Sequence, residues 1–139
     1  MPERYGDPTT EPFWEAAERR QLRIQRCRTC GKHQFFPRPV CISCFGTEVD
    51  WVEASGNATV YSQTTVRIPV TPELTPPYVV AVVALDEGPR ITTNLVGPAC
   101  RIGDRVKLAW RNREGLPPLP VFGPMDEDLK ITSNDLERK

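Results

Sequence analysis

The sequence predicts a mainly β protein with a short N-terminal helix, a metal-binding cysteine module and a five-stranded barrel of the OB type. Three observations lead to this fold class: an apolar stripe at helical spacing before residue 22, two Cys-x2-Cys pairs between residues 23 and 50, and a series of short apolar segments separated by Pro and Gly turns after residue 51. With 139 residues, the chain has room for a small metal module and one compact β domain.

We expect the first 22 residues to form a helical segment, with the helix itself near residues 11–20. Thr9 and Thr10 suit the N-cap, and Pro12 suits the first turn. Phe13 and Trp14 are large aromatics on a helix too short to be stable alone, so they must pack against something. We expect this pair to be exposed in the isolated chain.

Residues 23–50 form the cysteine module, whose pattern is Cys27-x2-Cys30-x10-Cys41-x2-Cys44. Each Cys-x2-Cys pair brings two thiolates to one ion, and two pairs complete a tetrahedron. Four soft sulfurs favour Zn²⁺ in a closed structural site, and iron is the main alternative. The ten-residue spacer predicts a tight hairpin between two knuckles of the rubredoxin type.

Residues 51–123 carry the barrel. We expect strands at 59–68, where polar and apolar residues alternate, at 78–85, which is apolar throughout and so covered on both faces, and at 90–96, 106–111 and 119–122. Residues 124–139 form an acidic tail that we expect to be mobile.

The charge balance and the lack of membrane or secretion signals limit the classes of function that the sequence favours. Lys and Arg number 18, equal to Asp and Glu, which argues against a dedicated nucleic-acid-binding protein. The segment 19–47 contains seven basic residues and no acidic one, a pattern that usually marks a solvated face and otherwise indicates a site for an anion or an acidic partner. No apolar run is long enough to cross a membrane and the first residues lack a secretion signal, so we expect a cytoplasmic protein with no membrane contact.

The sequence offers no residues from which to build an independent active site. It contains no Gly-rich nucleotide motif and no plausible pair of catalytic carboxylates. His33 is the only histidine and lies within the cysteine module, where we expect an exposed hairpin residue, and Cys100 is expected to be a buried structural thiol. We therefore assign no catalytic residue and predict that the chain is not an enzyme on its own.

The sequence resembles the zinc-ribbon OB-fold proteins associated with acyl-CoA. The resemblance covers residues 11–123 and lies in the runs from Pro12 to Ala17, from Leu22 to Gly31, from Phe36 to Cys41 and from Leu119 to Phe122, among others. It implies a rubredoxin-like ribbon, a structural zinc on Cys27, Cys30, Cys41 and Cys44, and an accessory role beside a thiolase or a lipid-transfer-type steroid aldolase, whose own residues perform the chemistry.

These observations together predict a non-catalytic subunit of a thiolase-superfamily enzyme that acts on an acyl-CoA, by retro-aldol cleavage of a steroid-type side chain or by thiolysis or condensation. The predicted partner contacts are Phe13, Trp14, Arg23 and Arg38. Candidates for the CoA phosphates are Arg101, Arg105, Lys107 and Arg111. Two alternatives remain open, a single-stranded nucleic-acid-binding module and a stand-alone acyl-CoA-binding protein. The acyl chain, the type of partner and the stoichiometry are not determined by the sequence.

Overall fold

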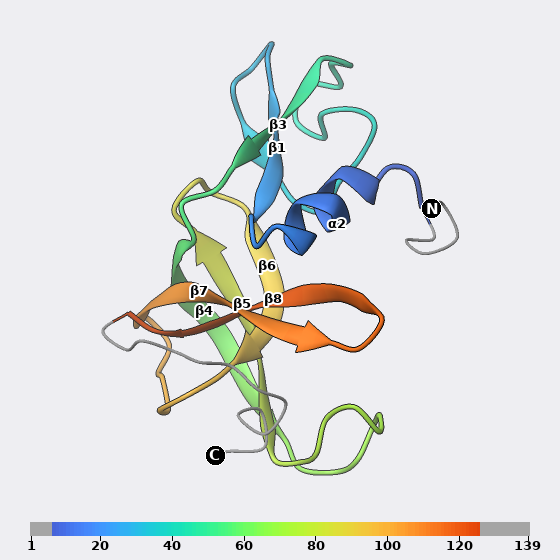
Figure 1. Ribbon diagram of the computed structural model, residues 1–139. Helices are drawn as coiled ribbons and strands as arrows, with labels where there is room; N and C mark the ends of the chain where they lie inside the picture. Colours follow the sequence, from blue (N-terminus) through green and yellow to red (C-terminus); the bar gives the residue numbers. More distant parts are fainter. Residues whose placement is uncertain (1–6, 126–139) are drawn as a thin grey trace.

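The computed structural model describes residues 7–125, which form two lobes joined at a short helix (Figure 1). The upper lobe is a three-stranded sheet in the order β2-β1-β3, and the lower lobe is a closed barrel in the order β4-β5-β6-β8-β7. The predicted fold class is confirmed. The elements are α2 (Glu11–Glu18), β1 (Arg23–Cys27), β2 (His33–Gln34), β3 (Val49–Glu53), β4 (Asn57–Val66), β5 (Tyr78–Leu85), β6 (Arg90–Leu95), β7 (Arg105–Arg113) and β8 (Leu116–Pro124).

Helix α2 ends two residues earlier than the sequence predicts. It begins after Thr10, whose side-chain hydroxyl donates to the carbonyl of Asp7 instead of capping the helix. At the other end, Arg20 has a left-handed φ of 61°. The N–H of Arg20 donates to the carbonyl of Ala17, and the N–H of Gln21 donates to that of Ala16. These two bonds close the helix in a Schellman arrangement and turn the chain into β1.

The helix packs against β1 and against β8 of the barrel, so its aromatic residues are less exposed than expected. Phe13 is only 5% exposed and belongs to the same core cluster as Ile24, Val83 and Phe122. The expectation that Phe13 is exposed is therefore wrong. Trp14 is half-buried at the edge of this cluster, with its ring 4.8 Å from that of Phe13. The lobes share one core because neither side has enough apolar surface to cover these rings alone.

The bounds of every barrel strand except β5 differ from the expected ones by one to three residues. Strand β4 ends at Val66, two residues before the predicted end, and Ile68 beyond it is 71% exposed. The pairing of β4 with β5 shifts register between Val60 and Ser62, and such a bulge breaks a strict period of two. In β5, buried residues alternate with half-buried ones, so only one face is fully covered.

The junction of the lobes is built from backbone contacts. Strand β3 pairs with β1 and lies across the predicted boundary between residues 50 and 51. The N–H of Ala54 then donates to the carbonyl of Leu22, and the N–H of Leu108 donates to that of Gly56. Gly56 has a φ of 87°, and a Cβ there would stand 3.1 Å from the Cβ of Leu108. A glycine is therefore required where the chain enters the barrel.

The ends of the chain bear on two expectations. Strand β8 runs to Pro124, which we had placed in the acidic tail. Residues 1–6 and 126–139 lie outside the described residues, and so does the rest of that tail. No helix among residues 7–125 is long and apolar enough to cross a membrane.

We predict that Phe13→Ala lowers the free energy of unfolding by about 3 kcal/mol, because it removes a large side chain from the core that joins the lobes. Chemical denaturation measures this value. Phe36→Ala is the matched control, because Phe36 is 53% exposed. We expect that change to stay within about 0.5 kcal/mol. Equal effects of the two substitutions would contradict the shared core.

Candidate metal centre and interlobe groove

The metal centre is built from two similar turns, each holding one Cys-x2-Cys pair. In the first turn, the N–H of Gly31 donates to the carbonyl of Cys27 at 2.9 Å. In the second, the N–H of Phe45 donates to the carbonyl of Cys41 at 2.8 Å. Gly31 and Phe45 both have left-handed backbones, with φ of 78° and 65°. Each turn therefore closes on the residue after its second cysteine and directs two sulfurs to one side.

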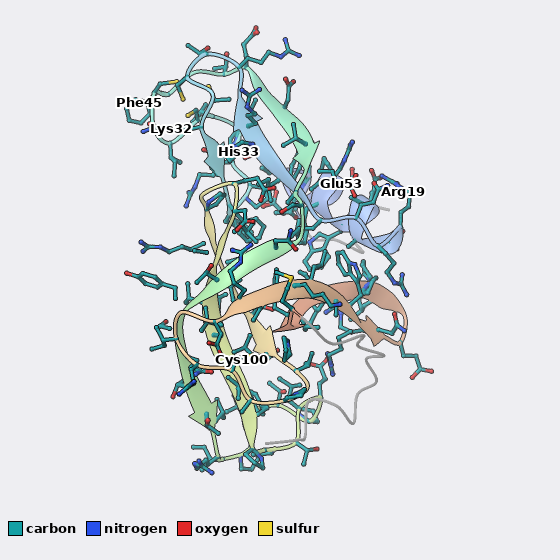
Figure 2. The ribbon with its side chains drawn as sticks, turned by 90° about the vertical axis from the view of Figure 1, so that its left-hand side faces the viewer. Arg19, Lys32, His33, Phe45, Glu53 and Cys100 are labelled. Carbon is teal, nitrogen blue, oxygen red and sulfur yellow. The ribbon has the colours of Figure 1, made fainter. Side chains whose placement is uncertain are left out.

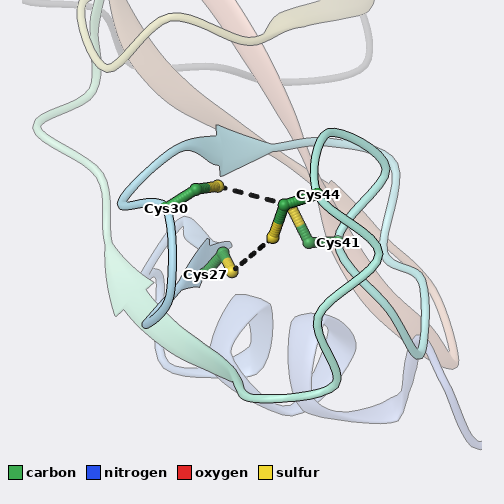
Figure 3. A group of neighbouring side chains, drawn as sticks. All are labelled: Cys27, Cys30, Cys41 and Cys44. Atoms are coloured by element: carbon green, nitrogen blue, oxygen red, sulfur yellow. Dashed lines mark hydrogen bonds between the residues drawn. The ribbon is translucent and has the colours of Figure 1, made fainter.

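The four sulfur atoms converge on one point, as Figure 3 shows. The Sγ atoms of Cys27 and Cys44 are 3.6 Å apart, as are those of Cys30 and Cys41. All four atoms lie within 4.8 Å of one another. A tetrahedron with metal–sulfur bonds of about 2.3 Å has edges of about 3.8 Å. The donor set therefore fits a tetrahedral metal ion with no open position.

Backbone amides prepare two of these thiols to bind a cation. The N–H of Cys30 is the main reason that the pKa of Cys27 is lowered to about 6. The pKa of Cys41 is also lowered, chiefly by the N–H groups of Cys44 and Ser43, the second at 3.3 Å from the sulfur. Deprotonated sulfur is the form that binds a metal, so these turns favour the ligand state.

Two buried glutamines, which the sequence analysis did not single out, support the second turn. Gln34 accepts the N–H of Ile42 at 3.0 Å and donates to Gln25 at 2.7 Å. Gln25 in turn accepts the N–H of Arg38 and donates to the carbonyl of the same residue, both at 2.8 Å. The pair fixes the segment between the two Cys pairs. Two polar residues in short strands gave no pattern from which this role could be predicted.

Cys100 and His33, the two other residues considered for chemistry, lie in different lobes and do not form a pair. His33 is half-buried in β2, opposite Arg26 of β1. Cys100 is buried in the barrel, well away from the ribbon (Figure 2), and burial raises the pKa of its thiol. A thiol with a raised pKa is a poor nucleophile, which agrees with the structural role predicted for it.

The four basic residues named for the CoA phosphates do not form one cluster. Arg105 pairs with both carboxylate oxygens of Asp86, at 2.7 and 2.9 Å. Arg111 is buried and donates to the carbonyl of Glu73 at 3.0 Å. Arg101 lies in the turn before β7, and Lys107 lies on β7 between Arg105 and Arg111, which are about 20 Å apart along an extended strand.

Three of the four predicted partner contacts line one groove between the lobes. The groove has a volume of ≈ 560 Å³ and includes Phe13, Trp14 and Arg38. Arg23 lies on β1 outside this lining, and its Nε is buried without a hydrogen-bond partner among the described residues. The other walls of the groove carry no pattern that singles them out in the sequence. They are formed by Thr10, Phe35, Phe36, Arg90, Ile91, Thr92, Thr93, Asn94, Leu119 and Pro120.

Two family profiles match the two lobes. Residues 14–50 match the rubredoxin-like zinc ribbon domain of ChsH2, and residues 51–111 match the C-terminal OB-fold domain of ChsH2. A solved structure described as an Ltp2–ChsH2(DUF35) aldolase superimposes with a TM-score of 0.79 and 41% identity, over 85% of this chain and 95% of that one.

Two curated relatives extend the comparison. A probable enoyl-CoA hydratase alpha subunit of Thermomonospora curvata is 45% identical over 116 residues, which is 81% of this chain and 36% of the relative. A DUF35 domain-containing scaffold protein of Methanothermobacter thermautotrophicus is 32% identical over 109 residues, 74% of this chain and 81% of the relative. The chain thus spans about a third of the hydratase subunit and most of the scaffold protein. It belongs to the ChsH2 (DUF35) family, whose members combine a rubredoxin-like zinc ribbon with an OB-fold.

Proposed function

We propose that this chain is a non-catalytic accessory subunit that binds an aldolase of the lipid-transfer, thiolase-like type and helps to form its acyl-CoA channel. The observation that carries the proposal is the match to the ChsH2 chain of the Ltp2–ChsH2 aldolase, which extends over both lobes. The similarity to a scaffold protein supports a role in assembly, and the similarity to a hydratase subunit supports a CoA thioester as the substrate of the complex.

The chemistry of the complex belongs to the partner in this proposal. The only histidine of the sequence lies in the ribbon, and the one cysteine outside the metal cluster has a raised pKa. Neither suits a base–nucleophile pair. An aldolase partner makes retro-aldol cleavage of a β-hydroxyacyl-CoA the favoured reaction, with a steroid-type side chain as the acyl group. Thiolysis or condensation is the reaction expected if the partner is a thiolase.

The four cysteines would hold a structural Zn²⁺ in this role. The ion would tie the two turns together and supply part of the folding energy of the ribbon. Trp14 and Arg38 then stand on the groove beside the ribbon, where we propose that the partner binds, with Phe13 supporting Trp14 from beneath. Arg23 remains a predicted contact at the margin of this surface. Direct contact of Arg101, Arg105, Lys107 or Arg111 with CoA also remains a prediction.

The proposal predicts one zinc ion per chain in metal-replete protein, measured by elemental analysis. Cys41→Ser should release the zinc and loosen the ribbon while the barrel stays folded, because most residues of the shared core belong to the barrel strands themselves. Amide exchange would show faster exchange in β1–β3 and unchanged exchange in β5. Cys100→Ser is the matched control and should keep the zinc. Protein purified without any metal would refute the assignment.

The proposal also predicts the pattern of activity. The purified chain should show no aldolase or hydratase turnover with a β-hydroxyacyl-CoA, and adding it to the purified aldolase subunit should raise the turnover of that subunit by at least about tenfold. Coupled assays of the aldehyde or ketone product measure both. Robust turnover by the isolated chain, or an aldolase subunit indifferent to it, would contradict the accessory role.

Trp14→Ala should weaken the complex by about 2 kcal/mol, as is usual for a large aromatic at a binding hot spot. The loss of stability should be smaller than for Phe13→Ala, because Trp14 is only half-buried. Isothermal calorimetry with the aldolase subunit measures the affinity. Phe45→Ala is the control, because Phe45 is 76% exposed at the far tip of the ribbon (Figure 2). Normal affinity of the Trp14 variant would show that this residue serves the fold alone.

A further inference from the structure

The barrel is incompletely paired along the seam between β6 and β8. Strand β6 pairs with β5 from Arg90 to Leu95, but among the described residues its backbone bridges β8 at Leu95 and Phe122 alone. One side-chain bond also spans this seam, from the hydroxyl of Thr93 to the carbonyl of Pro120 at 2.8 Å. The sequence of β8 explains the gap. The carbonyl of Phe122 accepts the N–H of Val96, so the backbone groups of Phe122 face β6. By strand alternation, residues two and four positions earlier face the same way, and both are prolines, which have no N–H to donate.

The exposed edge of β6 is centred on Thr92. Because the N–H of Val96 points toward β8, alternation directs the backbone N–H groups of Asn94 and Thr92 to the same side. Thr92 lies three residues before the single bridged position, and no strand among residues 7–125 pairs with it on that side. Its side chain is exposed, while those of Ile91 and Thr93 are buried. An edge with unpaired N–H and C=O groups is a template for a further strand.

The groove between the lobes runs along this edge. One wall is β6, another is formed by Leu119 and Pro120 of β8, and the rings of Trp14, Phe35 and Phe36 complete it. Trp14 and Phe35 each contact the ring of Phe13, and Phe36 contacts Phe35, with centroids 5.6 Å apart. Apolar pockets beside a polar backbone edge are the features by which an added strand is recognised: backbone bonds give affinity, and pockets for alternate side chains give specificity.

The charge of the groove selects its occupant. Arg38 and Arg90 are the charged residues of the lining, and no carboxylate lies among the lining residues. The guanidinium of Arg90 stands 3.9 Å from the ring centre of Tyr61, which holds it at the rim. The backbone of Arg38 is fixed on both sides by Gln25. Two positioned cations with no acid beside them favour an occupant that carries a carboxylate.

We propose that an extended segment of the aldolase subunit adds to β6 as a strand at Thr92. Its apolar side chains would lie against Trp14 and Phe36, and an acidic side chain would pair with Arg38 or Arg90. This inference rests on the proposed function and adds to it the mode by which the partner is held.

A substitution at one backbone position tests the added strand. Thr92→Pro removes the N–H that points away from β5, so it leaves the β5–β6 ladder intact, and proline is accepted at such edge positions. Thr92→Ala keeps the N–H and is the matched control. With the purified Ltp2-type aldolase subunit of the same organism, we expect calorimetry to show at least about tenfold weaker binding for the proline variant and less than about threefold for the alanine variant. Equal affinity of wild type and Thr92→Pro would overturn the inference.

A second measurement uses the unaltered chain and does not depend on the folding of a variant. Amide exchange followed by NMR should show that the N–H of Thr92 exchanges faster than those of Ile91 and Thr93 in the free chain, and at least about tenfold more slowly in the complex. Binding without protection of Thr92 would overturn the inference and leave the proposed function standing. No binding of the wild-type chain to the aldolase subunit would overturn both. A homodimer of the isolated chain that Thr92→Pro dissociates would assign the edge to a second copy and refute the inference.

Discussion

The convergence of four cysteine sulfurs on one point is the constraint on which the upper lobe depends. Its sheet has one two-residue strand, and the segment from residue 35 to 48 has no regular structure of its own. The cysteine turns and the buried Gln25–Gln34 pair hold that segment, together with the contact of the Phe35 ring with Phe13. A cation at the sulfurs would therefore do more than close the ribbon. It would set the position of Phe35, Phe36 and Arg38, which carry the ribbon's side of the groove.

The shared core connects the cysteine cluster of the ribbon to the position of the barrel. Phe13 and Ile24 reach the same buried cluster as the barrel residues Val83 and Phe122, so the two lobes are not free modules on a linker. The backbone bond between Ala54 and Leu22 fixes their junction further. A groove whose walls come from both lobes keeps its shape only if the lobes stay together. This rigidity suits a scaffold, because little free energy is lost on binding when the side chains and loops of the surface are already ordered.

The sequence was sufficient for the fold class, the four-cysteine cluster and the bounds of β5, because these depend on local patterns: a Cys-x2-Cys spacing, a turn on each side, a continuous apolar run. It was insufficient where tertiary contacts decide. Phe13 looked exposed because the surface that covers it, on β8, is more than a hundred residues away. The turn at Arg20 has the local bonds of a Schellman motif, but an arginine stands where glycine is usual, so the sequence carried no signal for it. The bulge after Val60 depends on a strand pairing that no spacing rule identifies. The groove was missed for the same reason, since β6 and β8 meet only in the closed barrel.

In the proposed function, the metal-bound ribbon and the barrel together present the surface that holds an aldolase subunit. The affinity of the chain for that subunit should therefore be measured before metal removal, after removal by a chelator, and after zinc is restored. We expect the metal-free chain to lose binding by at least about a hundredfold while the barrel strands remain folded, and zinc to restore it. Unchanged affinity of a metal-free chain would show that the partner is held without the ribbon and would refute this role.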